Sequence, residues 1–314
     1  MKIYFVSAQS QLLDYQIENI KKLGDFKMVI GDRLSPKDLV KKVHNANIIL
    51  AGRSGIDKLS QEVFENLRDL KFISVVGVGY EWIDIKSAVR KGIQISIAND
   101  GYSQSVAEHT WGMILDLSKR ITEFNRDLRE KGIYDFKNYL GREAYQKTIG
   151  ILGVGSVGKR VAGIAKSFDM KVLGFNRTKK DIDGVEFVDL DIILKNSDII
   201  AVCLPLTNDT ENLISEKEIK KVKKGVIIVN CAREKIINKK AISKAVKNGK
   251  VFAYGVETEI MVPIDKKDIY LNHPRILVTP HNAWNTKESR ERTYDVAIEN
   301  IKAFIEGNPK NIVS

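Results

Sequence analysis

The sequence predicts an α/β protein with two domains, each built on a doubly wound parallel sheet. Its 314 residues suffice for two domains of about 100 to 200 residues each, and for a large buried core. Short β-branched runs alternate with amphipathic stretches along the chain, which is typical of parallel sheets. The alternation breaks once, at the turn cluster Asn99-Asp100-Gly101, which predicts a junction between two sheets near residues 98–102.

The first hundred residues contain the runs expected for the first sheet. Residues 11–23 and 36–44, which lie between runs, have the apolar spacing of amphipathic helices. The predicted strands are KIYFV at 2–6, FKMVI at 26–30, ANIIL at 46–50, FISVV at 72–76 and IQISI at 93–97.

A long helix is expected after the junction. Ser105 is followed three residues later by Glu108, a capping-box spacing that predicts the start of the helix. Its predicted apolar side is Val106, Met113, Ile114, Leu117 and Ile121.

A second alternating series then predicts the second sheet. Its runs are TIGIL at 148–152, KVLGF at 171–175, VEFV at 185–188, DIIAVCL at 198–204, VIIVN at 226–230, VFAYGV at 251–256 and RILVT at 275–279. Residues 288–304 have the pattern of a further amphipathic helix. Packing of this tail on the first sheet would make the first domain discontinuous.

Charge and cysteine content exclude several classes of protein. The net charge is +11, but the lysines form scattered pairs on amphipathic segments without interleaved aromatic residues, so we expect no nucleic-acid partner. Cys203 and Cys231 lack the spacing of a disulfide framework or a zinc site, so we expect no metal. No apolar run has the 18 or so residues of a membrane span, and the start is too short for a signal peptide. We therefore expect a cytoplasmic protein with no membrane contact.

The segment Gly153-Val154-Gly155-Ser156-Val157-Gly158 is a candidate dinucleotide-binding turn. It follows a predicted strand and opens a predicted helix, and a further strand ends about 20 residues later, as in a Rossmann unit. Gly153 would form the tight turn, Gly155 would let a pyrophosphate approach the backbone, and Gly158 would permit close packing of helix on strand. The helix N-terminus then binds the anion.

The end of the next predicted strand indicates the cofactor. NAD sites have Asp or Glu there to accept from the ribose hydroxyls, whereas NADP sites need positive charge and small donors for the 2′-phosphate. This chain has Asn176, Arg177 and Thr178 and no carboxylate at that place. The set favours NADP; the alternative is an ordinary basic loop.

Two polar residues follow strands of the second sheet, where ligands of open α/β sheets gather. Arg233 lies just beyond VIIVN, and its guanidinium matches a carboxylate or a polarised carbonyl. His281 lies just beyond RILVT, and an imidazole can give and take a proton near neutral pH. Either residue alone would be ordinary, but their joint position beside a dinucleotide fold points to catalysis.

Five motifs resemble, in the same order, those of a known family, the D-isomer-specific 2-hydroxyacid dehydrogenases, over nearly the whole chain. The family includes glyoxylate and hydroxypyruvate reductases, phosphoglycerate dehydrogenase and D-lactate dehydrogenase. The motifs are Gly77-Val78-Gly79-Tyr80-Glu81-Trp82-Ile83-Asp84, similar to the substrate-carboxylate loop; Ser105-Val106-Ala107-Glu108-His109-Thr110, similar to the helix entering the cofactor domain; Cys203-Leu204-Pro205-Leu206-Thr207, similar to the loop lining the dinucleotide; Cys231-Ala232-Arg233, similar to the arginine motif; and Thr279-Pro280-His281-Asn282-Ala283, similar to the histidine motif.

The resemblance implies a domain organisation. A Rossmann-like cofactor domain at 101–284 would be inserted into a substrate domain formed by 1–100 and 285–314. The long helix and the following arm, about 115–145, would form a two-fold homodimer.

The resemblance also implies roles for single residues. Arg233 would bind the carboxylate and carbonyl oxygen of a 2-keto acid, and the backbone N–H groups of Val78 and Gly79 would share the carboxylate. His281 would protonate the carbonyl as hydride arrives, and Glu257 stands where the family has an aspartate near the nicotinamide carboxamide. The predicted cofactor-binding residues are Gly153, Gly155, Ser156, Val157, Gly158, Asn176, Arg177, Thr178, Cys203, Leu204, Pro205, Thr210, Cys231, Ala232, Glu257, His281 and Ala283.

One position departs from the family pattern. The glutamate that normally pairs with the catalytic histidine precedes a proline that matches Pro263, and here that position is Val262. Either Glu259 replaces the glutamate, or His281 works without a carboxylate and loses its proton at lower pH. We favour the first and include Glu259 among the predicted catalytic residues. His109 and Glu108 are expected to be structural.

Two functions follow from these motifs. The first is an NADPH-dependent reductase of small 2-keto acids that forms D-2-hydroxy acids. The alternative is a dinucleotide-binding sensor or interaction protein with weak turnover, which Val262 favours. Tyr80, Trp82 and Trp284 are expected to wall the substrate cleft, a set that suits either a compact acid or an aryl side chain.

Overall fold

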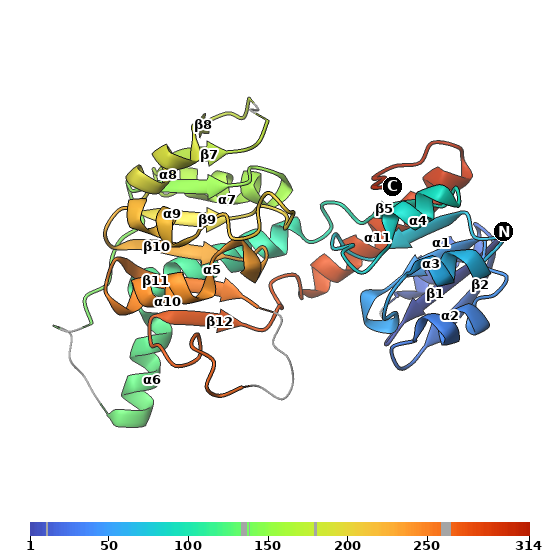
Figure 1. Ribbon diagram of the computed structural model, residues 1–314, viewed down its shortest axis with the longest axis horizontal. Helices are drawn as coiled ribbons and strands as arrows, with labels where there is room; N and C mark the ends of the chain where they lie inside the picture. Colours follow the sequence, from blue (N-terminus) through green and yellow to red (C-terminus); the bar gives the residue numbers. More distant parts are fainter. Residues whose placement is uncertain (11, 133–136, 138, 179–180, 259–264) are drawn as a thin grey trace. The chain divides into compact units, whose positions relative to one another are not determined.

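The computed structural model describes residues 1–10, 12–132, 137, 139–178, 181–258 and 265–314 (Figure 1). The chain divides into two compact units: unit 1 is Met1–Tyr102 with Asn285–Ser314, and unit 2 is Ser103–Trp284. Each unit contains a parallel sheet flanked by helices. The predicted fold class, two parallel-sheet α/β domains with one inserted into the other, is confirmed.

Unit 1 has a parallel sheet in the order β2-β1-β3-β4-β5 among its described residues. Its strands are β1 (Lys2–Ser7), β2 (Asp25–Ile30), β3 (Ile48–Ala51), β4 (Phe72–Val75) and β5 (Gln94–Ile97). Its helices are α1 (Asp14–Lys21), α2 (Pro36–Lys42), α3 (Gln61–Asn66), α4 (Ile85–Arg90) and α11 (Lys287–Ile305), with the 3-10 turn η1 (Arg53–Gly55).

Side chains alternate between the two faces of the unit 1 sheet, because successive residues of a strand point to opposite sides. Tyr4 and Val6 join the apolar cluster under α2, α3 and α4. Ile3 and Phe5 join the opposite cluster, which includes buried residues of α1 and α11. The predicted tail helix is therefore α11, and it packs on the sheet of unit 1.

Unit 2 has a parallel sheet in the order β12-β11-β10-β9-β6-β7-β8 among its described residues. Its strands are β6 (Thr148–Leu152), β7 (Lys171–Phe175), β8 (Glu186–Phe187), β9 (Ile199–Val202), β10 (Val226–Asn230), β11 (Val251–Glu257) and β12 (Ile276–Thr279). Its helices are α5 (Ser103–Lys119), α6 (Ile121–Lys131), α7 (Ser156–Lys166), α8 (Leu190–Asn196), α9 (Glu216–Lys221) and α10 (Lys239–Lys247), with the 3-10 turn η2 (Glu234–Ile236).

The unit 2 sheet is also covered on both faces. Ile149 and Ile151 of β6 lie in the cluster with α5 and α7, where the Trp111 and Phe168 rings stack with centroids 4.9 Å apart. Leu152 faces the opposite cluster, built with α8, α9 and α10. Burial on both faces explains why these strands are almost continuously apolar in the sequence.

The long helix differs from its prediction at both ends. It starts at Ser103, and the Ser105 hydroxyl donates to the carbonyl of Ala283 (2.6 Å), so the predicted capping box is wrong. At its other end Arg120 adopts a left-handed backbone conformation (φ 59°), and the chain continues as α6. Ile121, predicted on the apolar side, is therefore an exposed first residue of α6.

The lysine pairs lie mainly at helix ends. Lys41 and Lys42 end α2, and Lys220 and Lys221 end α9, where positive charge is favourable beside the carbonyl end of the helix dipole.

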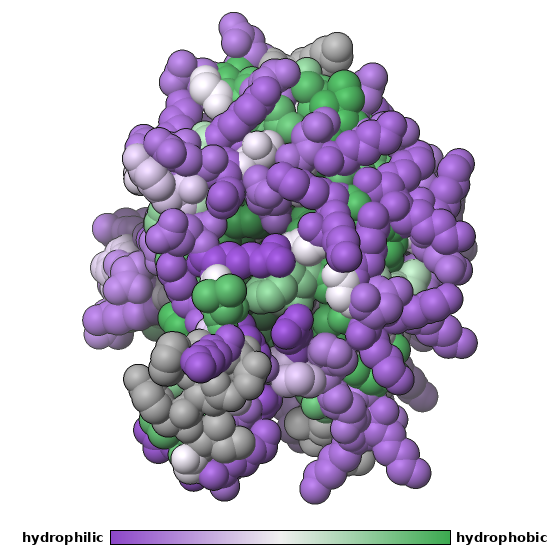
Figure 2. All heavy atoms as spheres, turned by 90° about the vertical axis from the view of Figure 1, so that its left-hand side faces the viewer, coloured by the Kyte–Doolittle hydropathy of each residue, from purple (hydrophilic) through white to green (hydrophobic). Residues whose placement is uncertain are grey.

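Figure 2 shows hydrophilic side chains over most of one face of the molecule, with apolar groups visible between them. Among the described residues, no helix is both long enough and apolar enough to cross a membrane.

Candidate active site

The glycine turn connects β6 to α7 and has the geometry that a pyrophosphate site needs. Gly153 has φ 97°, and a Cβ there would lie 2.7 Å from the Cys203 carbonyl oxygen. A Cβ at Gly158 would lie 2.2 Å from the carbonyl oxygen of Gly153, so helix and turn are in direct contact. A Cβ at Gly155 would meet nothing within 4 Å. The open space lies beside the first turn of α7, whose unpaired N–H groups suit a dinucleotide phosphate.

The end of β7 braces this turn. Oδ1 of Asn176 accepts a hydrogen bond from the backbone N–H of Val154 (2.7 Å). Asn176 therefore holds the glycine turn through its oxygen, which leaves its amide N–H groups as donors. Arg177 and Thr178 follow it and are exposed.

The loops after β9 and β10 lie next to each other, because Val202 and Asn230 are partners in the two strands. Burial raises the pKa of Cys203 well above its usual range and that of Cys231 to about 12, so both thiols are neutral at physiological pH. After Leu204 and Pro205 of the predicted set, the hydroxyl of Thr210 donates to the Pro205 carbonyl (2.7 Å) and closes the loop.

Arg233 follows β10 and is held through its backbone. The buried side chain of Asn230 accepts from the N–H of Ala232 (3.1 Å) and donates to the carbonyl of Arg233 (2.9 Å). The Arg233 guanidinium donates to the Ala232 carbonyl (3.0 Å) and is partly exposed. Asn230 was not among the predicted site residues; its only signal in the sequence is an asparagine at the end of an apolar strand.

His281 lies in the turn after β12, in a left-handed backbone conformation (φ 50°). Its carbonyl accepts from the Trp284 indole N–H (2.9 Å), so this indole braces the turn. Glu257, at the end of the neighbouring strand β11, is buried and accepts from the N–H groups of Asn282 (3.2 Å) and Ala283 (3.1 Å).

His109 of α5 approaches the same turn. Its Nε2 lies 3.1 Å from the Thr279 hydroxyl and 3.5 Å from the Glu257 carboxylate. Burial lowers the pKa of His109, while the negative charge of Glu257 opposes that shift. This imidazole, expected to be structural, therefore contacts the residues that hold the candidate catalytic histidine.

In unit 1 the predicted carboxylate loop follows β4. Val78 is exposed, and the carbonyl of Gly79 accepts from the indole N–H of Trp82 (3.1 Å). Trp82 is itself buried in the core of unit 1, with the Arg53 guanidinium 5.3 Å from its ring. Trp82 therefore supports the loop through this hydrogen bond and does not line a cleft. The side chain of Tyr80 is exposed and could still line the substrate cleft.

A family model for the NAD-binding domain of D-isomer specific 2-hydroxyacid dehydrogenases matches residues 111–283. The chain belongs to this family. As a D-2-hydroxyacid dehydrogenase it is an oxidoreductase, and the matched residues, which lie within unit 2, form its nicotinamide dinucleotide domain.

Individual relatives extend the match across the chain. The dehydrogenase is 32% identical over 295 residues to a glyoxylate reductase of Pyrococcus furiosus, covering 90% of this chain and 87% of that one. It is 33% identical over 304 residues to a D-3-phosphoglycerate dehydrogenase of Methanocaldococcus jannaschii, covering 95% of this chain but only 57% of the relative. The solved structure of an acyclic imino acid reductase (Bsp5) with NADPH and D-Arg has a TM-score of 0.91 and 27% identity, covering 100% of both chains.

The structure does not describe one segment that bears on the candidate site. Glu259 and Val262, on which the choice of partner for His281 depends, lie outside the described residues. Among the described residues, no group of three or more His, Cys, Asp and Glu side chains could hold a metal ion.

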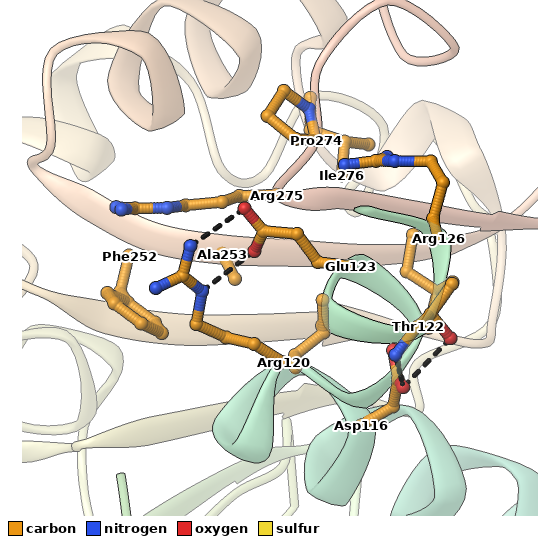
Figure 3. Close-up of a pocket in the computed structure, with 12 residues that line it drawn as sticks. Asp116, Arg120, Thr122, Glu123, Arg126, Phe252, Ala253, Pro274, Arg275 and Ile276 are labelled. Atoms are coloured by element: carbon orange, nitrogen blue, oxygen red, sulfur yellow. Dashed lines mark hydrogen bonds and ion pairs between the residues drawn. The ribbon is translucent and has the colours of Figure 1, made fainter. Parts of the chain in front are cut away.

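A cavity of about 70 Å³ lies elsewhere in the dehydrogenase (Figure 3). It is lined by α5, α6 and the amino ends of β11 and β12, where Arg120 makes a bidentate ion pair with Glu123 (2.8 Å for both contacts). Arg233, His281 and the glycine turn follow the carboxyl ends of their strands. The cavity therefore belongs to the opposite edge of the sheet.

Proposed function

We propose that this dehydrogenase is an NADPH-dependent reductase of small 2-keto acids that produces D-2-hydroxy acids. One observation carries the proposal: Arg233, His281 and the glycine turn all follow carboxyl ends of strands in one parallel sheet, after β10, β12 and β6. A carboxylate-binding cation and a proton donor thus share the sheet edge with a dinucleotide turn.

The choice of NADP rests on the end of β7. A ribose 2′-phosphate would meet the amide donors of Asn176, the guanidinium of Arg177 and the hydroxyl of Thr178, and none of these three residues is a carboxylate that would repel it. The acyclic imino acid reductase that shares this fold was solved with NADPH, which supports the same choice.

The proposed reaction assigns a task to each side chain. A bound nicotinamide supplies the hydride. Arg233 holds the substrate carboxylate and polarises the keto oxygen, and the N–H groups of Val78 and Gly79 bind the same carboxylate. His281 donates a proton to the keto oxygen as the carbon accepts hydride, and Glu259 is proposed to support that proton.

A second candidate substrate is the 2-imino acid. Two observations favour an imino acid substrate: the resemblance to the imino acid reductase and the valine at position 262. A protonated imine already carries the proton that a keto oxygen must receive, so its reduction depends less on a carboxylate that raises the pKa of His281.

The remaining features concern the whole protein. We propose that unit 2 binds the cofactor, that unit 1 contributes to substrate binding, and that the free thiols of Cys203 and Cys231 fit a cytoplasmic location. We also propose a homodimer formed by the arm at about 115–145. Large apolar side chains are exposed along it: Ile121 (57%), Leu128 (47%), Leu140 (77%) and Tyr145 (51%).

NADPH oxidation tests the function directly. Glyoxylate, hydroxypyruvate, pyruvate and phenylpyruvate should be assayed alone and with methylamine, followed by chiral analysis of the product. Turnover of the keto acids alone to D-hydroxy acids supports the first reaction, and turnover only with amine supports the imine. Tight NADPH binding without turnover in either series would instead support the sensor.

A further inference from the structure

We propose that Glu257 is a positioning residue for His281, acting through the backbone of the turn that carries the histidine and not through contact with the imidazole. The inference rests on the proposed function only in the role of His281. It differs from the sequence expectation, which placed Glu257 near the nicotinamide carboxamide.

The hydrogen bonds of Glu257 define this role. Its Oε1 accepts from the Thr279 hydroxyl and from the Asn282 N–H, and its Oε2 accepts from the Ala283 N–H. These three donors lie on both sides of His281. One buried carboxylate therefore ties together the two ends of the turn, and charge-assisted bonds of this kind are stronger than neutral ones.

The turn needs such a tie because its backbone is strained. His281 has φ 50°, a left-handed conformation that a residue with a Cβ adopts only where surrounding contacts hold it. Two further bonds act on the same segment: the Trp284 indole donates to the His281 carbonyl, and the Ser105 hydroxyl donates to the Ala283 carbonyl.

His109 extends the network to α5. Thr279 has one hydroxyl proton, which it gives to Glu257, so its oxygen must accept from Nε2–H of His109 (3.1 Å). The chain His109 to Thr279 to Glu257 thus fixes the tautomer of His109 and the orientation of the carboxylate.

Positioning by the backbone suits a chain with a valine at position 262. A carboxylate on the imidazole would both orient it and raise its pKa, whereas the Glu257 network orients the turn without touching the ring. Orientation alone is worth a large factor, because a displacement of about 1 Å in a catalytic group can cost about 10²-fold in rate.

Two pairs of variants test the proposal. Glu257→Gln replaces one acceptor oxygen by a donor, while Glu257→Asp keeps the charge. Thr279→Val removes the hydroxyl, while Thr279→Ser keeps it. Glu186→Gln, an exposed carboxylate paired with Lys171 (2.9 Å), is the control. The measurements are kcat and KM for the best keto or imino substrate, NADPH affinity, and hydrogen exchange of the Asn282 and Ala283 amides.

We expect Glu257→Gln and Thr279→Val to lower kcat by about 10- to 100-fold with little change in NADPH affinity. Exchange at the Asn282 and Ala283 amides should rise about tenfold or more. Glu257→Gln removes the charge of the group that accepts from these amides, and Thr279→Val removes the hydroxyl that orients it. Glu257→Asp and Thr279→Ser should recover most of both effects. If Glu257→Gln fails to fold, the threonine pair decides alone.

The proposal is overturned if the amides stay as protected as in the parent, or if kcat is unchanged while they exchange faster. A large loss of NADPH affinity in Glu257→Gln with normal exchange would overturn it in favour of direct cofactor contact. If the parent has no turnover, the proposed function fails, but the exchange measurement still decides whether Glu257 holds the turn.

Discussion

At the scale of single residues, the candidate site consists mostly of backbone atoms held by polar side chains, of which Asn230 and Glu257 are buried and Asn176 is half-buried. Asn176 holds Val154, Asn230 holds Ala232 and the Arg233 carbonyl, and Glu257 holds the turn around His281. The buried side chains of Asn230 and Glu257 have hydrogen-bond partners, as buried polar groups require. The groups proposed to bind ligands are therefore attached to backbone segments that these hydrogen bonds hold in place.

Arg177 should decide the preference for NADPH. Arg177→Ala loses a charge-assisted contact to the 2′-phosphate and should weaken NADPH binding by about 1.5 to 3 kcal/mol, with NADH little affected. Fluorescence titration with both cofactors measures this, with the exposed Lys217→Ala as control. Equal NADPH and NADH dissociation constants in the parent would contradict the cofactor assignment.

His281 should act on turnover and not on cofactor affinity. His281→Ala removes the proposed proton donor and should lower kcat by about 10² to 10⁴. His44→Ala, a change to an exposed histidine of unit 1, should leave kcat and KM at their parent values. A parent-like rate in His281→Ala would mean that the proton comes from another group.

The pH profile should identify the partner of His281. A neighbouring carboxylate favours the protonated imidazole and raises its pKa, so it extends reduction to higher pH. If Glu259 is that partner, Glu259→Gln should move the falling limb of kcat/KM to lower pH, and Val262→Glu should change little. If there is no partner, Val262→Glu alone should move the limb upward. A limb unmoved by both changes would show that another group titrates.

At the scale of elements, contact between the glycine turn and α7 connects packing to function. A Cβ at Gly158 would lie 2.2 Å from the Gly153 carbonyl oxygen, whereas one at Gly163 in the same helix would meet nothing within 4 Å. Close packing therefore excludes a side chain at Gly158, whereas the space around Gly163 would admit one.

Alanine at these two positions should have opposite effects. Gly158→Ala must push α7 away from β6, and should lower the free energy of unfolding by about 1 to 3 kcal/mol and weaken dinucleotide binding. Gly163→Ala should raise the free energy of unfolding by about 0.5 to 1 kcal/mol, because alanine loses less conformational entropy than glycine when the helix forms. Thermal unfolding and cofactor titration measure both; a stable Gly158→Ala protein with parent affinity would refute the close-contact argument.

At the scale of the whole molecule, the exposed apolar side chains of the arm should determine the oligomeric state. Leu140→Asp places a charge where a second copy would bury leucine, and should shift sedimentation from dimer towards monomer. Val89→Asp, at an equally apolar exposed position of unit 1 (53%), should leave the dimer intact. A parent that sediments as a monomer at all concentrations would disprove the proposed dimer.

The sequence by itself determined the two-sheet organisation, the glycine turn and the family. Strand and helix periodicities are local properties, and each predicted strand run overlaps an observed strand. The tail helix on unit 1 was also predictable, because its apolar face needed a sheet to cover. Arg233 and His281 became candidate site residues because they follow apolar strands directly.

Only the tertiary structure decided which polar groups meet. Glu257 and Asn282 are 25 positions apart in the chain, and no local pattern places a carboxylate of one strand on the turn after the next. The start of α5 was mispredicted for the same reason, since the Ser105 hydroxyl bonds to Ala283 and not to its own helix. Trp82 was expected at a cleft, but the packing of unit 1 buries it. Hydrogen bonds and burial between distant segments depend on how strands are ordered in a sheet, and that order is not a local property of the sequence.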